Sequence, residues 1–458
     1  MSKRRLSSPP APVYQPGVLP LVAIVGRPNV GKSTLFNRLS RSRKALVDDR
    51  PGVTRDRHYA ATETFGRPYF LVDTGGLNVD ESTLLHHHIN EQIRTAIAEA
   101  DLLVCVLDAR AEPTEADRIL MEAARASRKP LIVVANKADA PAHAHEAAAH
   151  YELGIDNILP ISALHVHGLA LLEEMIAGYL PKPNADTDAD TTALPRVAVL
   201  GRPNAGKSSL TNRLLGEARQ VVDDVPGTTT TATETLVTLG GTSMIWIDTA
   251  GIRRRRSVER GLESLSVLQA IDVMRRADAV VLLVDGKEGA VEQDAKLAAL
   301  AADSGRALIV ALNKVDLWQG ELDATLRTVG DNLSFVEWAP RVRISATHGR
   351  GLTRLEATLA KVLGAHARRV STAELNRFFA AVIEDNPPPV TGGRAPRIYY
   401  VTQAATCPPT FVAMTNGPDR IRDSYRRYLV NKLREFFDFE GTPIRIYFRG
   451  KSPRAPEP

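Results

Sequence analysis

The sequence predicts an α/β fold with two tandem P-loop domains, each a mostly parallel sheet covered by helices on both faces, and a small C-terminal α+β domain. Three observations support this prediction. The phrase GRPNxGKS occurs twice, 175 residues apart, at Gly26–Ser33 and Gly201–Ser208. Each copy follows an apolar run and precedes a helix-like stretch, the context that a phosphate-binding loop requires. Downstream of each copy, apolar strands alternate with helical segments.

The apolar runs predict the strands of each sheet. In the first repeat they are Leu21–Val25, Pro68–Asp73, Leu102–Asp108, Leu131–Ala135 and Ile158–Ile161. In the second repeat they are Val197–Leu200, Ser243–Asp248, Ala279–Asp285, Ala307–Leu312 and Arg341–Ile344. Ligands of such sheets bind at the carboxyl ends of the strands, where the polar motifs follow.

The repeat stops near residue 366, and an α-β-β-α-β pattern follows. We expect a helix at Thr372–Glu384, strands at Arg397–Gln403 and Thr410–Thr415, a helix from about Asp419 to Phe437, and a strand at Pro443–Phe448. The domain boundaries are then 1–18 for a disordered basic arm, 19–180 and 196–365 for the P-loop domains, 181–195 for a linker, 366–450 for the C-terminal domain and 451–458 for a disordered tail.

Charge is distributed unevenly along the 458 residues. The chain has a net charge of +5, whereas residues 366–458 carry 15 Lys/Arg against 9 Asp/Glu. This basic end favours a polyanionic partner, although a solvated charged face is the alternative. No run of 18 apolar residues predicts a membrane span, and residues 1–18 lack the apolar core of a secretory signal. With only Cys105, which we expect to be buried, and Cys407, a reducing cytoplasm is the expected compartment.

Each P-loop has the residue types that bind phosphate. Its glycines allow backbone N–H groups to turn toward phosphate oxygens, and the following helix adds its positive N-terminal end. Lys32 and Lys207 would contact the β- and γ-phosphates. The candidate phosphate-binding residues are Gly26, Arg27, Pro28, Asn29, Val30, Gly31, Lys32, Ser33 and Thr34, and Gly201, Arg202, Pro203, Asn204, Ala205, Gly206, Lys207, Ser208 and Ser209.

Hard oxygen ligands at fixed distances from each P-loop lysine predict a Mg²⁺ site. A threonine follows each lysine by 22 residues and an aspartate by 41. The predicted ligands are Ser33, Thr54, Asp73, Ser208, Thr229 and Asp248. The aspartates open DTGG and DTAG, in which Thr74, Gly75, Gly76, Leu77, Thr249, Ala250, Gly251 and Ile252 are candidate nucleotide contacts. The candidate catalytic residues are Lys32, Thr54, Gly76, Lys207, Thr229 and Gly251.

The NKAD and NKVD motifs predict guanine rather than adenine as the base. The carboxylates of Asp139 and Asp316 can each accept hydrogen bonds from guanine N1–H and its exocyclic amine, and adenine lacks this donor pair. The NKxD asparagines follow the P-loop lysines by 104 and 106 residues, each directly after an apolar strand. The candidate base-site residues are Asn136, Lys137, Asp139, Ser162 and Ala163, and Asn313, Lys314, Asp316, Ser345 and Ala346.

These motifs, in this order, resemble those of the translation-factor-type GTPases. Two such domains followed by a small basic α/β domain are similar to the bacterial double-GTPase family called EngA or Der. The resemblance covers roughly residues 19–450. It implies two Era-like GTPase domains, a C-terminal KH-like domain and a role in maturation of the large ribosomal subunit.

A glutamine that orients the attacking water follows DxxG in Ras-like proteins. Leu77 and Ile252 stand there in this chain, so we expect slow intrinsic hydrolysis. The family resemblance implies one substitute, because Asn29 and Asn204 match an asparagine that helps to bind K⁺ in related GTPases. A monovalent cation there would neutralise charge in the transition state. The alternative is that these asparagines only stabilise the loop.

Three further features carry weaker interpretations. A metal role for His86–His88 is disfavoured, because adjacent helical side chains point about 100° apart. The run Arg253–Arg256 is either an RNA or domain contact or a solvated loop. Basic and aromatic residues of the C-terminal domain favour RNA contacts, but a G-x-x-G loop of the KH type is missing. These residues are Arg397, Arg420, Arg422, Tyr425, Arg426, Arg427, Tyr428, Lys432, Arg434, Arg445 and Arg449.

We therefore expect a monomeric, cytoplasmic GTPase whose partners are GTP, GDP, the large ribosomal subunit and rRNA, with Mg²⁺ and K⁺ as the ions. Nucleotide state is expected to control its docking on rRNA during subunit assembly. One alternative is a GTP-sensing RNA-binding scaffold in which one domain scarcely hydrolyses GTP. The other is a partner GTPase for RNA modification, which is disfavoured because no cysteine-rich or cofactor-binding pattern occurs in the C-terminal domain.

Overall fold

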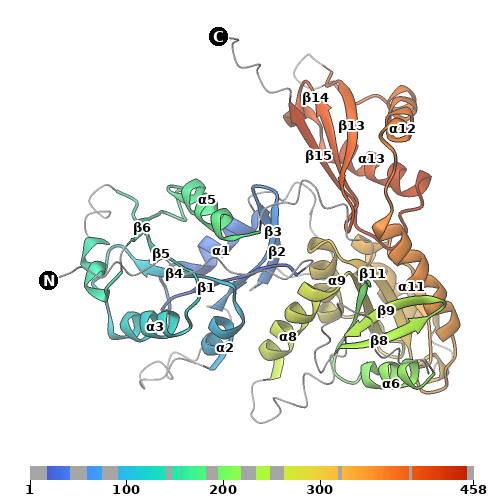
Figure 1. The fold of residues 1–458 in the computed structure, drawn as a ribbon, viewed down its shortest axis with the longest axis horizontal. Helices are drawn as coiled ribbons and strands as arrows, with labels where there is room; N and C mark the ends of the chain where they lie inside the picture. Colours follow the sequence, from blue (N-terminus) through green and yellow to red (C-terminus); the bar gives the residue numbers. More distant parts are fainter. Residues whose placement is uncertain are drawn as a thin grey trace. The chain divides into compact units, whose positions relative to one another are not determined.

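The computed structural model describes residues 18–41, 59–74, 91–140, 147–155, 157–181, 194–217, 234–247, 262–317, 322–390 and 395–450. These residues fall into two compact units. One unit contains a six-stranded sheet with its helices, and the other contains a second six-stranded sheet and a three-stranded sheet (Figure 1). The domain boundaries predicted above remain predictions.

The first sheet has the strand order β2-β3-β1-β4-β5-β6. Its strands are β1 (Leu21–Val25), β2 (Tyr59–Thr64), β3 (Arg67–Asp73), β4 (Leu102–Asp108), β5 (Leu131–Asn136) and β6 (Leu159–Pro160). Only β2 runs antiparallel to its neighbour, and the other pairs are parallel. Because β1 and β4 are central and buried on both faces, their sequences LVAIV and LLVCVLD are almost continuously apolar.

Helices cover both faces of this sheet (Figure 1). Val22 and Ile24 of β1 pack in one cluster with α1 and α5, whereas Ala23 and Val25 pack in another with α2 and α3, as the alternation of strand side chains requires. Cys105 is fully buried, as expected, and burial raises the pKa of its thiol to about 12. The helices are α1 (Lys32–Arg41), α2 (Glu91–Glu99), α3 (Glu115–Ala126), η3 (Ala147–Leu153) and α5 (Leu169–Tyr179).

The second sheet repeats this arrangement, with the order β12-β11-β10-β7-β9-β8. Its strands are β7 (Arg196–Leu200), β8 (Glu234–Leu239), β9 (Thr242–Ile247), β10 (Ala279–Asp285), β11 (Ala307–Asn313) and β12 (Arg341–Arg343). The helices of the second repeat are α6 (Lys207–Glu217), α8 (Leu262–Arg276), α9 (Glu292–Asp303), η4 (Val315–Leu317), α10 (Leu322–Asn332), η5 (Ser334–Val336) and α11 (Leu352–Ala367). Again only the β8–β9 pair is antiparallel.

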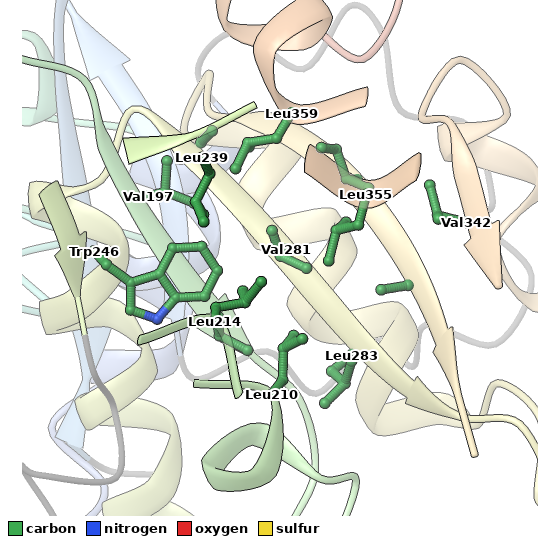
Figure 2. Packing of buried hydrophobic residues seen from close by; sticks show 14 of the residues in the cluster. Val197, Leu210, Leu214, Leu239, Trp246, Val281, Leu283, Val342, Leu355 and Leu359 are labelled. Atoms are coloured by element: carbon green, nitrogen blue, oxygen red, sulfur yellow. The ribbon is translucent and has the colours of Figure 1, made fainter. Parts of the chain in front are cut away.

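The core on one face of the second sheet joins α6 and α11 to the strands (Figure 2). Trp246 of β9 lies near Leu214 of α6, and Leu355 and Leu359 of α11 lie over Val281 of β10. The Trp246 indole N–H donates to Thr211 Oγ1 at 3.3 Å, so its polar atom is satisfied. Burial of each large apolar side chain contributes roughly 1.5–3 kcal/mol, and this core therefore fixes the strand that leads into the P-loop.

The C-terminal domain has the expected α-β-β-α-β order. It contains α12 (Thr372–Asp385), β13 (Ile398–Ala405), β14 (Thr410–Thr415), η6 (Pro418–Arg420), α13 (Asp423–Phe436) and β15 (Arg445–Gly450). In the sheet order β13-β14-β15, the first pair is antiparallel and the second parallel. Apolar side chains of both helices and all three strands form its core. Within the same unit, Leu308 N–H of β11 donates to Gly441 O of this domain at 2.8 Å.

The sequence interpretation missed two strands and placed several element boundaries differently from the structure. β2 and β8 are edge strands with partly exposed residues, so they lack the continuous apolar run of the central strands. The helix expected from Asp419 begins at Asp423, because Ile421 is extended and buries its side chain. The last strand begins at Arg445 rather than Pro443, which has no N–H to donate to a ladder. Among the described residues, no helix is long and apolar enough to cross a bilayer.

Candidate nucleotide-binding sites

Both P-loops connect the end of a central strand to the following helix. Each contains an asparagine and a glycine with left-handed backbone conformations: Asn29 (φ 64°) and Gly31 (φ 90°), then Asn204 (φ 63°) and Gly206 (φ 99°). Asparagine and glycine tolerate this conformation better than most residues. The repeated backbone turns the loop into the same cradle in both domains, and the side chains of Asn29 and Asn204 are exposed.

The asparagine of each NKxD motif joins three of the predicted motifs. Asn136 Nδ2 donates to Val30 O of the P-loop at 2.8 Å, and its Oδ1 accepts from Ala163 N–H at 2.9 Å. Asn313 makes the same pair of bonds at 2.8 and 2.9 Å, to Ala205 O and from Ala346 N–H. Both asparagines are buried. The phosphate loop, the base motif and the SA motif are therefore connected through one side chain in each domain.

The P-loop lysines donate to carbonyl groups of their own loops. Lys32 Nζ donates to Arg27 O at 2.7 Å, and Lys207 Nζ donates to Gly201 O and Arg202 O at 2.7 and 2.6 Å. Burial lowers the pKa of Lys32, and the nearby carboxylate of Asp73 opposes this effect. An anionic phosphate would likewise favour the charged ammonium.

Oxygen donors suitable for Mg²⁺ meet in the first domain. Ser33 Oγ donates to Asp73 Oδ2 at 2.7 Å, and Asp73 is only 1% exposed. Thr74 Oγ1 donates to Ile24 O at 2.9 Å and so holds the end of β3 against β1. A hydroxyl and a carboxylate beside a phosphate cradle fit the hard-oxygen preference of this ion.

The carboxylates predicted to contact the base are held by the serines of the SA motifs. Ser162 Oγ donates to Asp139 Oδ1 at 2.6 Å. In the second domain, the hydrogen bond from Ser345 is the main reason that the pKa of Asp316 lies below its usual value. Both aspartates are partly exposed, at 19% and 16%. Each site therefore presents an acceptor carboxylate at the edge of the sheet.

Each site contains one aspartate, Asp108 or Asp285, that the sequence interpretation did not single out. Lys137 Nζ contacts Asp108 Oδ2 at 2.7 Å, and Lys314 Nζ contacts Asp285 Oδ2 at 2.6 Å. Burial by itself would raise the pKa of Asp108, but its hydrogen bond with Lys137 leaves it below the usual value. These aspartates end β4 and β10 at corresponding positions of the two repeats, a signal that aligning the repeats would have revealed.

The two predicted base sites differ in the residue that faces the NKxD carboxylate. Arg110 pairs with Asp139 and also donates to Lys137 O at 3.1 Å. In the second domain, His348 Nδ1 lies 3.5 Å from Asp316 Oδ2. The repeat alone does not predict this difference, because Arg110 and His348 come from different loops.

Several predicted residues lie outside the described part of the chain. They are Thr54, Gly75, Gly76, Leu77, His86, His87, His88, Thr229, Asp248, Thr249, Ala250, Gly251, Ile252, Arg253, Arg254, Arg255 and Arg256. The assignments made for them remain predictions.

Some residues of the C-terminal domain that were predicted to contact RNA instead make contacts within the protein. The predicted set of RNA contacts is therefore too large. Tyr425 is 4% exposed and its hydroxyl donates to Asn386 O at 2.7 Å. Arg434 donates to Phe439 O and Thr442 O, both at 2.6 Å, and stacks on Trp338. Arg445 donates to Asp303 O at 3.0 Å. The basic residues of that set that remain exposed are Arg397, Arg422, Arg427 and Arg449.

Comparison with protein families agrees with this geometry. Residues 21–137 and 196–314 match the family described as 50S ribosome-binding GTPase, and residues 369–449 match the KH-domain-like C-terminal domain of EngA bacterial GTPase enzymes. Residues 267–372 also match the elongation factor Tu GTP binding domain. GTPase Der of Geobacter metallireducens is 43% identical, and the match covers 95% of this chain and 100% of the relative. The chain belongs to the Der (EngA) family of GTPases.

A second relative and one solved structure are also similar to this chain. GTPase Der of Thermomicrobium roseum is 42% identical, and the match covers 96% of this chain and 97% of the relative. A crystal structure of Era in complex with MgGDPNP and part of 16S ribosomal RNA is 22% identical, with a TM-score of 0.30, and covers 58% of this chain and 91% of that chain. The protein is a GTP hydrolase with a C-terminal KH-like domain and tandem GTPase domains, which match the family described as 50S ribosome-binding GTPase.

Proposed function

We propose that both P-loop domains bind and hydrolyse GTP, and that nucleotide state controls docking on rRNA during assembly of the large ribosomal subunit. The observation that carries the first part is the duplicated asparagine bridge of Asn136 and Asn313, which connects phosphate loop, base motif and SA motif in both domains. Because the bridge is intact in both repeats, it favours two competent sites over a scaffold with one inactive copy.

The residue roles follow from the geometry. Lys32 and Lys207 would exchange their loop carbonyl partners for β- and γ-phosphate oxygens. Asp139 and Asp316, oriented by serine hydroxyls, would accept N1–H and the exocyclic amine of guanine. In the first domain Ser33 and Asp73 would hold Mg²⁺, an ion that neutralises phosphate charge when bound. The remaining activation barrier to GTP hydrolysis would be lowered by groups that orient the attacking water.

The exposed arginines of the C-terminal domain form the surface that we propose for docking on rRNA. Arg397, Arg422, Arg427 and Arg449 are exposed, and Arg397 lies over the ring of exposed Tyr399. Arginine guanidinium groups and aromatic rings are the usual contacts to unpaired bases and to the backbone of RNA. The family description as a 50S ribosome-binding GTPase supports the same partner.

Ribosomal co-sedimentation tests the switch. We expect the protein to pellet with the large subunit at least several-fold more with a non-hydrolysable GTP analogue than with GDP, because contacts to the γ-phosphate favour a conformation that GDP cannot maintain. Combined replacement of Arg397, Arg422, Arg427 and Arg449 by Gln should weaken pelleting in every nucleotide state and reduce its salt dependence. Equal pelleting with the analogue, with GDP and without nucleotide would reject control by nucleotide state.

The dependence of turnover on K⁺ tests whether a bound K⁺ ion substitutes for the missing glutamine after DxxG. We expect faster GTP turnover in K⁺ than in Na⁺ at equal ionic strength, because the exposed amides of Asn29 and Asn204 can offer a carbonyl oxygen to a cation. Asn29→Gly and Asn204→Gly are the matched variants, since glycine keeps the left-handed backbone without the amide. Stimulation should vanish in the double variant. Equal rates in both salts, or stimulation that survives the glycine variants, would contradict this role.

A further inference from the structure

Each P-loop contains an arginine whose side chain contacts a buried carboxylate, on α3 in the first repeat and on α9 in the second. Arg27 Nε lies 3.4 Å from Asp117 Oδ2 of α3, and Arg202 Nε donates to Asp294 Oδ2 of α9 at 3.2 Å. Asp117 is 1% exposed and Asp294 0%. The two aspartates occupy corresponding positions of the repeats, so the pair is observed independently in both domains.

The same carboxylate oxygen also caps the start of its helix. Thr114 N–H and Thr114 Oγ1 donate to Asp117 Oδ2 at 3.0 and 2.7 Å, and Val291 N–H donates to Asp294 Oδ2 at 3.1 Å. A neutral amide could accept these bonds. A charge buried to this extent is costly unless it is paired, and the P-loop arginine supplies the opposite charge. Helix capping alone therefore does not explain why a charged aspartate, rather than an asparagine, stands at this position.

The backbone of the same arginine contacts the P-loop lysine. Lys32 Nζ donates to Arg27 O, and Lys207 Nζ donates to Arg202 O. One residue thus connects the phosphate-binding lysine, through its carbonyl, to the buried aspartate, through its guanidinium. The P-loop asparagine and glycine with left-handed backbone conformations lie between this arginine and this lysine in the chain.

We propose that Asp117 and Asp294 are positioning residues for nucleotide binding, each anchoring the P-loop arginine and so the backbone that surrounds the phosphates. The proposal rests on the assignment of the two P-loops as the phosphate sites. Asp117 Oδ1 and Asp294 Oδ1 are buried and accept no hydrogen bond in the described part of the chain. They can therefore receive a second arginine N–H when the loop closes on phosphate.

A preorganised loop loses less conformational freedom on binding, so this pair should strengthen GDP and GTP binding alike. An interaction made equally in the ground and transition states affects KM and leaves kcat unchanged. A purely structural role would instead lower the fraction of folded protein, with normal affinity in the remainder. The ratio of KM to kcat effects therefore separates the two roles.

The test uses the full chain with one site silenced. In a Lys207→Ala background, which should bind one GDP per chain, Asp117→Asn keeps an oxygen for the helix cap and removes the charge. We expect its dissociation constants for GDP and for a GTP analogue to rise together by about 5–20-fold, with kcat within about twofold, because the ion pair that holds the loop is lost. Arg27→Ala should give the same result, and the double variant should be no worse.

The second domain supplies a matched control. In a Lys32→Ala background, Asp294→Asn should weaken binding in the same way, whereas Glu288→Ala should change it less than about twofold, because Glu288 is 60% exposed although it lies 2.8 Å from Arg202. Wild-type affinity in both Asp117→Asn and Arg27→Ala, or fully additive effects, would overturn the proposal. Two GDP bound per chain in the Lys207→Ala background would overturn the P-loop assignment and the proposal with it.

Discussion

Asp316→Asn is expected to reverse the base preference of the second site from guanine to xanthine. The aspartate offers only acceptors, which match N1–H and the exocyclic amine of guanine, whereas an asparagine offers one acceptor and one donor group. Xanthine keeps N1–H but has a carbonyl oxygen in place of the amine. We expect GTP affinity to fall at least about 100-fold, since a buried donor is left unpaired, and XTP affinity to rise correspondingly. Nucleotide titration in a Lys32→Ala background measures both.

The same change at Asp139 provides the comparison between domains. Arg110 faces Asp139, whereas His348 faces Asp316, so the second site gives the simpler result. In Asp139→Asn the arginine has to move before the amide can donate to xanthine. We therefore expect GTP affinity to fall equally in the two domains, and XTP affinity to rise less in the first domain than in the second. Unchanged GTP affinity in either variant would show that the carboxylate does not read the base.

Gly31→Ala and Gly206→Ala are expected to abolish nucleotide binding in their respective domains. A Cβ at Gly31 would lie 2.3 Å from Asn136 Nδ2, and one at Gly206 would lie 2.2 Å from Asn313 Nδ2. Both glycines have φ values near +90°, where a side chain costs on the order of 1–3 kcal/mol. The variant must break the asparagine bridge to relieve the contact, so we expect GDP affinity to fall by roughly 100-fold or more.

Helical glycines of the same domains are the matched controls. Gly178 of α5 and Gly216 of α6 have open space around the position of an added Cβ. Alanine there should leave GDP binding unchanged and raise the free energy of unfolding by about 0.5–1 kcal/mol, because alanine favours the helix. GDP titration and thermal unfolding of all four single variants separate loop geometry from a general effect of the methyl group. Normal affinity in Gly31→Ala would refute the bridge as the limiting contact.

Local patterns identified the central strands because those strands are buried on both faces. Leu102–Asp108 and Ala279–Asp285 were predicted with the observed boundaries, since a continuous apolar run leaves little choice of structure. β2 and β8 were missed, because an edge strand alternates between core and solvent and has no strong signal of its own. The motif residues of the two sites were predicted from their spacing, which is nearly the same in both repeats.

The sequence by itself determined the fold class and the repetition of one domain, and it predicted the chemistry of each nucleotide motif, because these depend on residue type and order along the chain. Only the tertiary structure decided which side chains meet. It placed Asn136 between two loops, paired Arg27 with Asp117, and directed Tyr425 and Arg434 into packing rather than toward RNA. Such contacts join residues far apart in sequence, and their distances follow from the packing of helices on the sheet, which no local pattern encodes.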